Sequence, residues 1–170
     1  MDEHLSVAVA ALAERFGAQV SEFRDQVSVL LAPEHVAAAC QLLRDEFGFD
    51  SLAGQTAVDY WPEEQPRFHL VYLLYSFEHY QRLSLRLPVN AGALTVPTIE
   101  KIYPNANWYE REIWDMFGLR FEGHTDLRRI LMPYDWVGHP LRKDYPLGYE
   151  EVQFSFNYDE IDQRKPYARE

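Results

Sequence analysis

The sequence predicts an α+β fold, in which a mixed β-sheet has helices packed mainly on one face and an extended irregular C-terminal arm follows. First, segments with apolar residues at helical spacing alternate along the chain with segments of strand-like alternation. Second, the strand-like segments gather between helical ones, an order typical of α+β domains. Third, beyond Gly118 the periodicity is lost, and glycine and proline recur too often for long regular elements. We therefore expect a globular domain over residues 1–118 and a C-terminal arm over residues 119–170.

Two helices and a hairpin are predicted in the first third of the chain. Apolar residues at helical spacing over residues 5–16 predict a helix that ends at a glycine. Residues 20–23 and 27–31 show the alternation of two short strands with a polar turn between them. A proline then starts a second helix, whose apolar face over residues 36–47 includes Cys40. We interpret Cys40 as a small core residue, because no nearby group would stabilise a thiolate.

Three further strands and a helical turn follow. Residues 52–60 predict a moderate strand, and the almost wholly apolar residues 68–75 predict a central one. Residues 82–87 alternate cleanly, and the short gap before them predicts a hairpin with the preceding strand. His69 lies inside the central strand, where we interpret it as a satisfied sheet residue and not as a ligand. Residues 98–103 predict a short helical turn.

The last predicted helix ends at Gly118, which suits a C-terminal cap. Asn107 is expected to cap its beginning, with Glu110 at the third helical position as in a capping box. Arg111 and Asp115 are four residues apart, a spacing at which opposite charges on a helix can pair.

Composition excludes several classes of function. The net charge of −11 disfavours nucleic acid and anionic lipid as partners, since both need a basic face. A single cysteine cannot form an internal disulfide or supply the four thiolates of an iron–sulfur cluster. No apolar run approaches the roughly 20 residues of a membrane span. The acidic N-terminus lacks the basic start of a targeting segment, so we expect a location in the cytosol or on its side of a membrane.

The titratable residues do not predict catalysis. His124 and His139 have carboxylates nearby, but no pair of ligands shows the short spacing of a zinc site. Glu110 and Glu112 could act as an acid–base pair, yet at this spacing they point to different sides of a helix. Glycine-rich nucleotide loops and a nucleophile elbow are absent from the sequence. We therefore predict no catalytic, cofactor-binding or metal-ligating residue in this chain.

Residues 108–146 combine large aromatics with many charges. The segment holds three of the four tryptophans, seven acidic residues and six basic ones, which sum to −1. So many charges cannot be buried in a core, and so many large aromatics are unfavourable in a solvated loop. Aromatic and arginine side chains supply most of the binding energy at protein interfaces, and charges fix the register. The segment therefore predicts a surface that another protein covers.

The same segment carries an ordered set of motifs: ERE, then WDMFG, then FEGHTDLRRIL, then GHPLRKDYP. Their residues are Glu110, Arg111, Glu112, Asp115, Phe117, Gly118, Phe121, Glu122, Gly123, His124, Asp126, Leu127, Arg128, Arg129, Ile130, Leu131, Gly138, His139, Pro140, Leu141, Arg142, Lys143, Asp144 and Pro146. This series resembles the thirty-kilodalton subunit family of respiratory complex I, which in bacteria is the C-subunit family of NADH-quinone oxidoreductases.

The resemblance implies a cofactor-free subunit that packs against two others, the forty-nine-kilodalton-type (D-type) subunit and the twenty-kilodalton-type (B-type) subunit. FMN, iron–sulfur clusters and quinone would then belong to partner subunits. The complex would lie at the cytoplasmic face of the bacterial cell membrane, and the chain would meet the membrane only through the complex. The residues implied in partner docking are Glu110, Arg111, Glu112, Asp115, His124, Asp126, Arg128, Arg129, Trp136, His139, Arg142, Lys143 and Asp144.

Two alternatives stay open at the level of sequence. One is the equivalent subunit of a related membrane-bound hydrogenase or of a ferredoxin- or F420-type dehydrogenase complex. The other is a free-standing soluble enzyme. We also expect the C-terminal arm to fold mainly on its partner, because its sequence is irregular and rich in aromatics. We expect some of Arg128, Arg129, Arg142 and Lys143 to cross the interface or to pin the arm to the domain, and at least one of these arginines to be buried on assembly.

Overall fold

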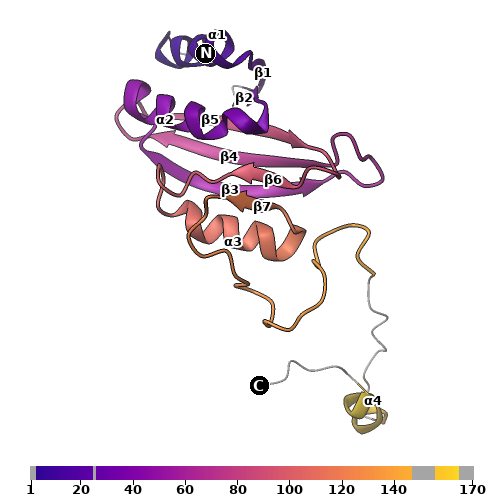
Figure 1. Ribbon diagram of the computed structural model, residues 1–170. Helices are drawn as coiled ribbons and strands as arrows, with labels where there is room; N and C mark the ends of the chain where they lie inside the picture. The colour runs from indigo at the N-terminus through magenta and orange to yellow at the C-terminus, as the bar shows by residue number, and fades with distance from the viewer. Residues whose placement is uncertain (1–2, 25, 147–155, 165–170) are drawn as a thin grey trace.

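A computed structural model describes residues 3–24, 26–146 and 156–164. Its helices are α1 (Glu3–Phe16), α2 (Val36–Phe47), α3 (Ala106–Phe117) and α4 (Tyr158–Arg164), and a 3-10 turn, η1 (Pro33–His35), leads into α2. The strands are β1 (Gln19–Phe23), β2 (Gln26–Leu30), β3 (Ser51–Asp59), β4 (Phe68–Ser76), β5 (Gln81–Val89), β6 (Thr95–Pro97) and β7 (Arg120–Glu122). The predicted helices and strands of the first 118 residues are thus present, with ends that shift by a residue or two (Figure 1).

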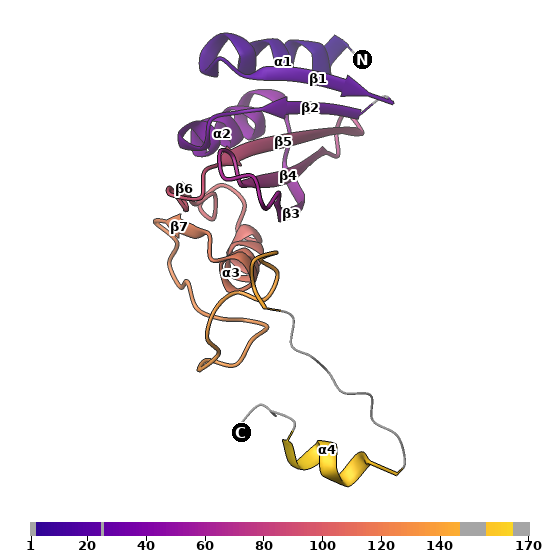
Figure 2. The same ribbon diagram turned by 90° about the vertical axis from the view of Figure 1, so that its right-hand side faces the viewer.

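The main sheet has five strands in the order β1-β2-β5-β4-β3. Neighbouring strands are antiparallel, except that β2 and β5 run parallel, so the sheet is mixed as predicted. The predicted hairpin between β4 and β5 is confirmed, and both strands lie inside the sheet. Seen edge-on, the strands are stacked with α1 beside β1 at one end and α3 beside β3 at the other (Figure 2).

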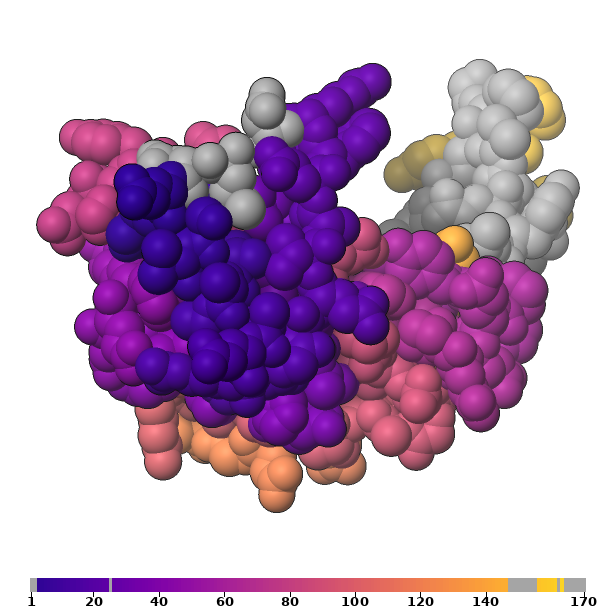
Figure 3. Space-filling view, turned by 90° about the horizontal axis from the view of Figure 1, so that it is seen from above, coloured from indigo at the N-terminus to yellow at the C-terminus, as the bar shows by residue number. Residues whose placement is uncertain are grey.

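One face of the sheet carries the hydrophobic core and the helices. Leu70, Tyr72 and Leu74 of β4 point toward this core, and at most 1% of each side chain is exposed. Phe117 of α3 meets Phe68 of β4 edge to face on the same side, with ring centroids 6.4 Å apart. On the other face, side chains of β4 and β5 alternate between half-buried and exposed. The predicted α+β fold with helices mainly on one face is therefore confirmed. Seen from above, α1 and the β1–β2 hairpin occupy much of the surface (Figure 3).

The beginning of the C-terminal arm differs from the prediction. Strand β7 pairs in parallel with β6 and forms a small second sheet, so the arm is regular in its first residues. Sequence periodicity could not indicate these strands, because each is only three residues long. Helix α4 is a second regular element, near the C-terminal end of the arm.

The capping box predicted for α3 is wrong. The helix begins at Ala106, and the side chain of Asn107 donates a hydrogen bond to Glu100 Oε1 at 2.8 Å. Glu110 does not turn back to its own helix: it is fully buried and accepts hydrogen bonds from the Ile99 amide (2.9 Å) and the Thr98 hydroxyl. The predicted turn before α3 is thus present, and Glu110 holds it from inside the domain. Burial raises the pKa of Glu110, and the bonds from Thr98 and Ile99 oppose that shift.

Candidate docking interface

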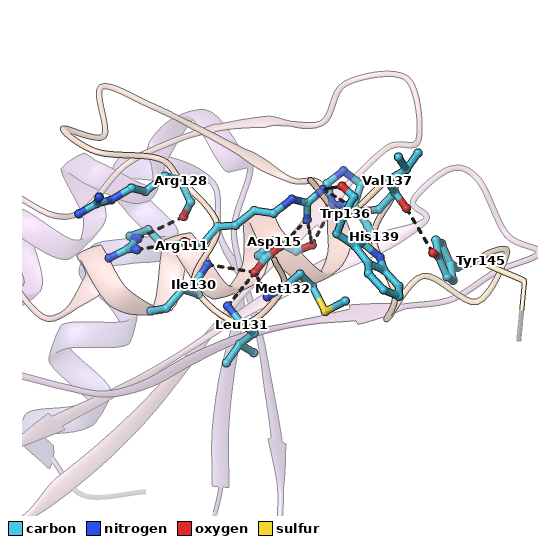
Figure 4. A network of polar contacts seen from close by, with 12 residues as sticks. Arg111, Asp115, Arg128, Ile130, Leu131, Met132, Trp136, Val137, His139 and Tyr145 are labelled. Atoms are coloured by element: carbon cyan, nitrogen blue, oxygen red, sulfur yellow. Dashed lines mark hydrogen bonds and ion pairs between the residues drawn. The ribbon is translucent and has the colours of Figure 1, made fainter. Parts of the chain in front are cut away.

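Asp115 is the centre of the contacts that hold the C-terminal arm (Figure 4). It lies in the last turn of α3 and is fully buried. Its Oδ2 accepts hydrogen bonds from three successive amides of the arm, those of Ile130 (3.0 Å), Leu131 (2.8 Å) and Met132 (2.9 Å). Its Oδ1 pairs with the guanidinium of Arg129. A single buried carboxylate therefore fixes the backbone path of the arm over four residues.

The charge on Asp115 is stabilised by its neighbours. Burial alone would raise the pKa of this carboxyl, but the Met132 amide, the Arg129 guanidinium and the remaining two amides lower it below its ordinary value. Arg129 also donates to the carbonyl oxygens of Trp136 (2.8 Å) and Gly138 (3.1 Å). Only 14% of its side chain is exposed. Arg129 thus pins the arm to the domain within this chain. The burial of Arg128 or Arg129 on assembly with a partner stays a prediction.

Arg111 holds the arm one helical turn earlier. Its guanidinium donates to the carbonyl oxygens of Arg128 and Arg129, each at 3.2 Å, and lies 5.1 Å from the centroid of the Trp108 ring. The predicted ion pair between Arg111 and Asp115 is wrong, because Asp115 is occupied by Arg129 and by arm amides. Helical spacing brings two charges within reach of each other, but it does not show which other partners compete for them.

A glycine in the left-handed conformation lets His139 approach the end of α3. Gly118 has φ = +78°, and a Cβ atom there would lie 2.6 Å from His139 Cδ2. His139 Nδ1 lies 2.9 Å from the carbonyl oxygen of Asp115, so this nitrogen carries the proton and donates it. The Leu141 amide donates to the Met116 carbonyl at 3.0 Å. The GHPL motif thus covers the C-terminal end of the helix.

A second contact ties the end of the motif to the main sheet. Arg67 forms a bidentate pair with Asp59 (both bonds 3.0 Å) and a second one with Asp144 (2.9 and 2.6 Å). Asp59 also accepts a hydrogen bond from the Lys143 amide at 2.9 Å. The planar fork of arginine suits two carboxylates at once, which lysine could not match. Arg67 also stacks on Trp61, 4.9 Å from its ring centroid.

This cluster of two carboxylates and one guanidinium shifts all three pKa values. Burial opposes ionisation of Asp59, but Arg67, the Lys143 amide and the Trp61 amide outweigh it and lower the pKa of Asp59 to about 2. Arg67 also lowers the pKa of Asp144. The two carboxylates, Asp144 first, raise the pKa of Arg67 above its ordinary value. Asp59, Asp144 and Arg67 are therefore all charged at neutral pH, and both carboxylates form salt bridges with Arg67.

The FEGH motif turns the chain after β7. Glu100 accepts hydrogen bonds from the Thr125 hydroxyl (2.6 Å) and the Thr125 amide (3.0 Å). His124 Nε2 lies 3.1 Å from the Asn107 carbonyl, and its Nδ1 accepts from the Asp126 amide at 3.0 Å. These two partners match a neutral ring with its proton on Nε2. His124 therefore braces a turn and does not face a metal site.

The residues predicted to dock fall into two groups. Several side chains are occupied within the chain, and these are Glu110, Arg111, Asp115, His124, Arg129, His139 and Asp144. Arg142 is half-buried, with its guanidinium 5.5 Å from the Phe68 ring centroid. The exposed ones are Glu112, Asp126, Arg128, Trp136 and Lys143, of which Asp126 and Arg128 form a surface ion pair at 2.8 Å. Docking remains a prediction for the outward group, and the inward group shapes the arm.

Four exposed apolar residues of the arm were not among the residues predicted to dock. Leu131, Tyr134, Val137 and Leu141 expose 61%, 92%, 85% and 54% of their surfaces. The rest of the described chain leaves these side chains largely uncovered. Asp59 and Arg67 were also missed, because they are more than seventy residues away from their arm partners in sequence. The only signal for them was the placement of charges at the ends of two strands.

Over residues 119–146 the arm makes contacts within this chain. Its backbone is held by buried groups of this chain, with Asp115 and Asp59 as the two fixed points. That residues 119–170 fold mainly on a partner stays a prediction, and residues 147–155 and 165–170 lie outside the described residues. Among the described residues, no helix is long and apolar enough to cross a bilayer. In the same part of the chain, no three His, Cys, Asp or Glu side chains come together as candidate metal ligands.

Comparisons with known proteins agree with the motifs. A family model described as "Respiratory-chain NADH dehydrogenase, 30 Kd subunit" matches residues 29–151. The C subunit of NADH-quinone oxidoreductase from Roseiflexus sp. (strain RS-1) is 48% identical over 152 residues, which cover 88% of this chain and 87% of the relative.

Two solved structures share the fold. A trypsin-resistant fragment of Nqo5 matches with a TM-score of 0.65 and 28% identity, over 73% of this chain and 99% of the fragment. A chain of the membrane-bound sulfane sulfur reductase, an archaeal respiratory membrane complex, matches with a TM-score of 0.68 and 21% identity, over 99% of this chain and 97% of that one. The second match shows the fold alone. The family model and the Roseiflexus relative together show that the chain belongs to the family of the 30 Kd subunit of respiratory-chain NADH dehydrogenase.

Proposed function

We propose that the chain is a cofactor-free structural subunit of the peripheral arm of respiratory complex I. It supports NADH-to-quinone electron transfer coupled to proton translocation by packing against the forty-nine-kilodalton-type (D-type) subunit, close to the twenty-kilodalton-type (B-type) subunit. FMN, iron–sulfur clusters and quinone belong to the partner subunits. The chain itself is non-catalytic and lies at the cytoplasmic face of the bacterial cell membrane, which it meets only through the complex.

The two-sided construction of the C-terminal arm carries this proposal. Its inner side is fixed by buried polar contacts to α3 and the sheet, and its outer side presents Leu131, Tyr134 and Val137. A chain that exposes large apolar groups on a rigid support is suited to protein association, since their burial supplies the driving force. Because the backbone is already ordered, association loses less conformational entropy than the docking of a free segment would.

Exposed charged residues fit a role in orientation. Glu112 of α3 and Arg128 and Lys143 of the arm are exposed and carry both signs. Complementary charges at the rim of an interface mainly set the association rate and the register. We therefore assign affinity to the apolar side chains of the arm and orientation to these three charges.

Purification of a tagged chain from its own host tests the proposal. The D-type and B-type subunits should co-purify with it in equal amounts. Val137→Glu should reduce their recovery at least tenfold, while Val7→Glu, on an exposed position of α1, should change it less than twofold. Full recovery with Val137→Glu, or FMN or iron near one per isolated chain, would contradict the proposal.

The archaeal respiratory complex suggests a second candidate. The fold match covers nearly the whole chain, so an equivalent subunit of a related membrane-bound hydrogenase or ferredoxin- or F420-type dehydrogenase complex has the same structural basis. The identity of the co-purified subunits separates the two. A complex I predicts subunits with FMN and an NADH-driven reduction of quinone, whereas the alternative predicts hydrogen, ferredoxin or F420 as the electron source.

A further inference from the structure

The face of the main sheet opposite the helices has a charge unlike the rest of the molecule. Its centre is built from three cross-strand pairs of β4 and β5, namely Val71 with Arg86, Leu73 with Ser84 and Tyr75 with Arg82, and we call this set the open sheet face. The chain has a net charge of −11, yet the outward positions of the five strands hold no aspartate or glutamate. Glu22 and Asp59, the acidic residues of these strands, lie in register with inward positions.

Within the described residues, neither arginine of the open sheet face is part of a salt bridge. Arg86 donates one hydrogen bond to the Tyr60 hydroxyl at 2.8 Å, but its Nε is buried without a partner among the described residues. The buried Nδ1 of the neighbouring His69 also has no hydrogen-bond partner among the described residues. The prediction that the hydrogen-bonding groups of His69 are satisfied is therefore wrong for this atom. Burial and the charge of Arg86 lower the pKa of His69, and the charge of Glu63 opposes this shift.

Apolar side chains separate the two arginines. Leu73 exposes 48% of its surface between them, and Val58 on the neighbouring strand exposes 37%. A surface depression with Leu73, Tyr75, Arg82 and Ser84 in its lining extends to the β1–β2 hairpin, whose Glu22 lines its far part. A hydrophobic centre with arginines beside it has the composition of an interface core, because arginine and aromatic or aliphatic anchors dominate binding energy there.

We infer that the open sheet face is a second docking surface, which binds a polypeptide surface of another subunit that presents carboxylates among apolar side chains. The inference rests on the proposed function, since it assigns a further contact within the same complex. Carboxylates would pair with Arg82 and Arg86, and aliphatic groups would cover Leu73. The arginines select a carboxylate partner because their planar groups bind it bidentately. Repulsion from the acidic remainder of the chain disfavours a second copy and an anionic lipid surface.

Zero-length cross-linking in the assembled complex tests the inference. All three lysines of the chain, at positions 101, 143 and 165, lie outside these strands, so Arg82→Lys places a single amine on the open sheet face. Carbodiimide treatment should join it to an aspartate or glutamate of another subunit. The control Arg120→Lys, also exposed but on β7, should give no such product.

A charge-reversal pair provides the second measurement. Arg82→Glu should lower the amount of chain recovered in the complex at least tenfold, and Lys101→Glu, exposed outside the open sheet face, should change it less than twofold. The inference fails if Arg82→Lys gives no link to another subunit and Arg82→Glu assembles as well as Lys101→Glu. The proposed function then still stands, provided that the unsubstituted chain co-purifies with its partners. A link to a second copy of this chain, or binding to anionic vesicles that Arg82→Glu abolishes, also overturns the inference. Absence of co-purification for the unsubstituted chain overturns the proposed function instead.

Discussion

Replacement of Asp115 by asparagine tests whether one carboxylate holds the C-terminal arm. The substitution keeps the size of the side chain but removes its charge and turns an amide group toward Arg129 or the arm amides. Asp115 is fully buried and only 14% of the Arg129 side chain is exposed, so the change leaves a largely buried guanidinium unpaired. Breaking a buried pair in this way costs about 3–5 kcal/mol, and we take about 3 because Arg129 keeps two carbonyl partners.

Hydrogen exchange of the isolated chain measures this loss. At about 1.4 kcal/mol per factor of ten, the amides of Ile130 and Met132 should exchange about a hundredfold faster in Asp115→Asn. The matched control is Asp126→Asn, which removes the same chemical pair from the surface, where its partner Arg128 is 71% exposed. Its cost should be about 0–1 kcal/mol, a factor of five or less. Equal exchange rates in the two variants would refute the assignment of Asp115 as the fixed point of the arm.

Three further outcomes follow from the geometry. Because the pKa of Asp59 is lowered to about 2, its stabilisation should be complete above pH 4 and disappear as the pH falls toward 2, a loss of about 2 kcal/mol in the free energy of unfolding that Asp59→Asn should abolish. Gly118→Ala should destabilise the chain more than Gly17→Ala, because both positions have positive φ but only at Gly118 would a Cβ lie 2.6 Å from His139. The left-handed strain alone costs about 1–2 kcal/mol at either position. Denaturant unfolding of the two variants measures the difference. Because burial raises the pKa of Glu110, its stabilisation is complete below its unfolded pKa and is lost as the pH rises through its folded pKa. Glu110→Gln should therefore flatten the fall of the unfolding free energy above the ordinary pKa of a glutamate.

Periodicity was sufficient to predict most helices and strands of the first 118 residues, because most of these elements bury one regular stripe. The α2 stripe of Val36, Cys40 and Leu43 is fully buried, and the alternation of β5 separates Leu83 and Leu85 in the core from Arg86 outside. Such patterns arise from the geometry of a single element against a core, which local sequence records.

The contacts of the arm could not be predicted in this way. The pairing of Arg67 with Asp144 joins residues 77 apart, and nothing in the local sequence of either marks the other. Asp115 was expected to pair within its helix, but a buried carboxylate gains more from four converging donors than from a single neighbour on its own helix. The motif therefore identified the family. The division of its residues into bracing and outward ones required the three-dimensional arrangement.

Because some residues brace the arm and others face outward, their effects on assembly can be measured separately. If Asp115 holds the arm closed in the free chain, binding to the partner starts from a preorganised surface, and the apparent affinity equals the intrinsic affinity times the fraction of closed arms. Asp115→Asn removes no outward side chain, so any loss of affinity must come from that fraction. The loss should therefore match the arm opening measured by hydrogen exchange in the same variant. It should also be partly restored by osmolytes that favour compact states.

Val137→Glu provides the contrasting case, because it alters the outward surface and leaves every bond to Asp115 in place. Its exchange rates in the free chain should equal those of the unsubstituted chain while its affinity falls at least tenfold. Titration of the purified partner subunit with each variant, analysed beside the exchange data, separates the two effects. If Asp115→Asn opens the arm to a population of half or more and still binds with unchanged affinity, the closed arm is not the binding-competent form, and the partner orders this segment itself.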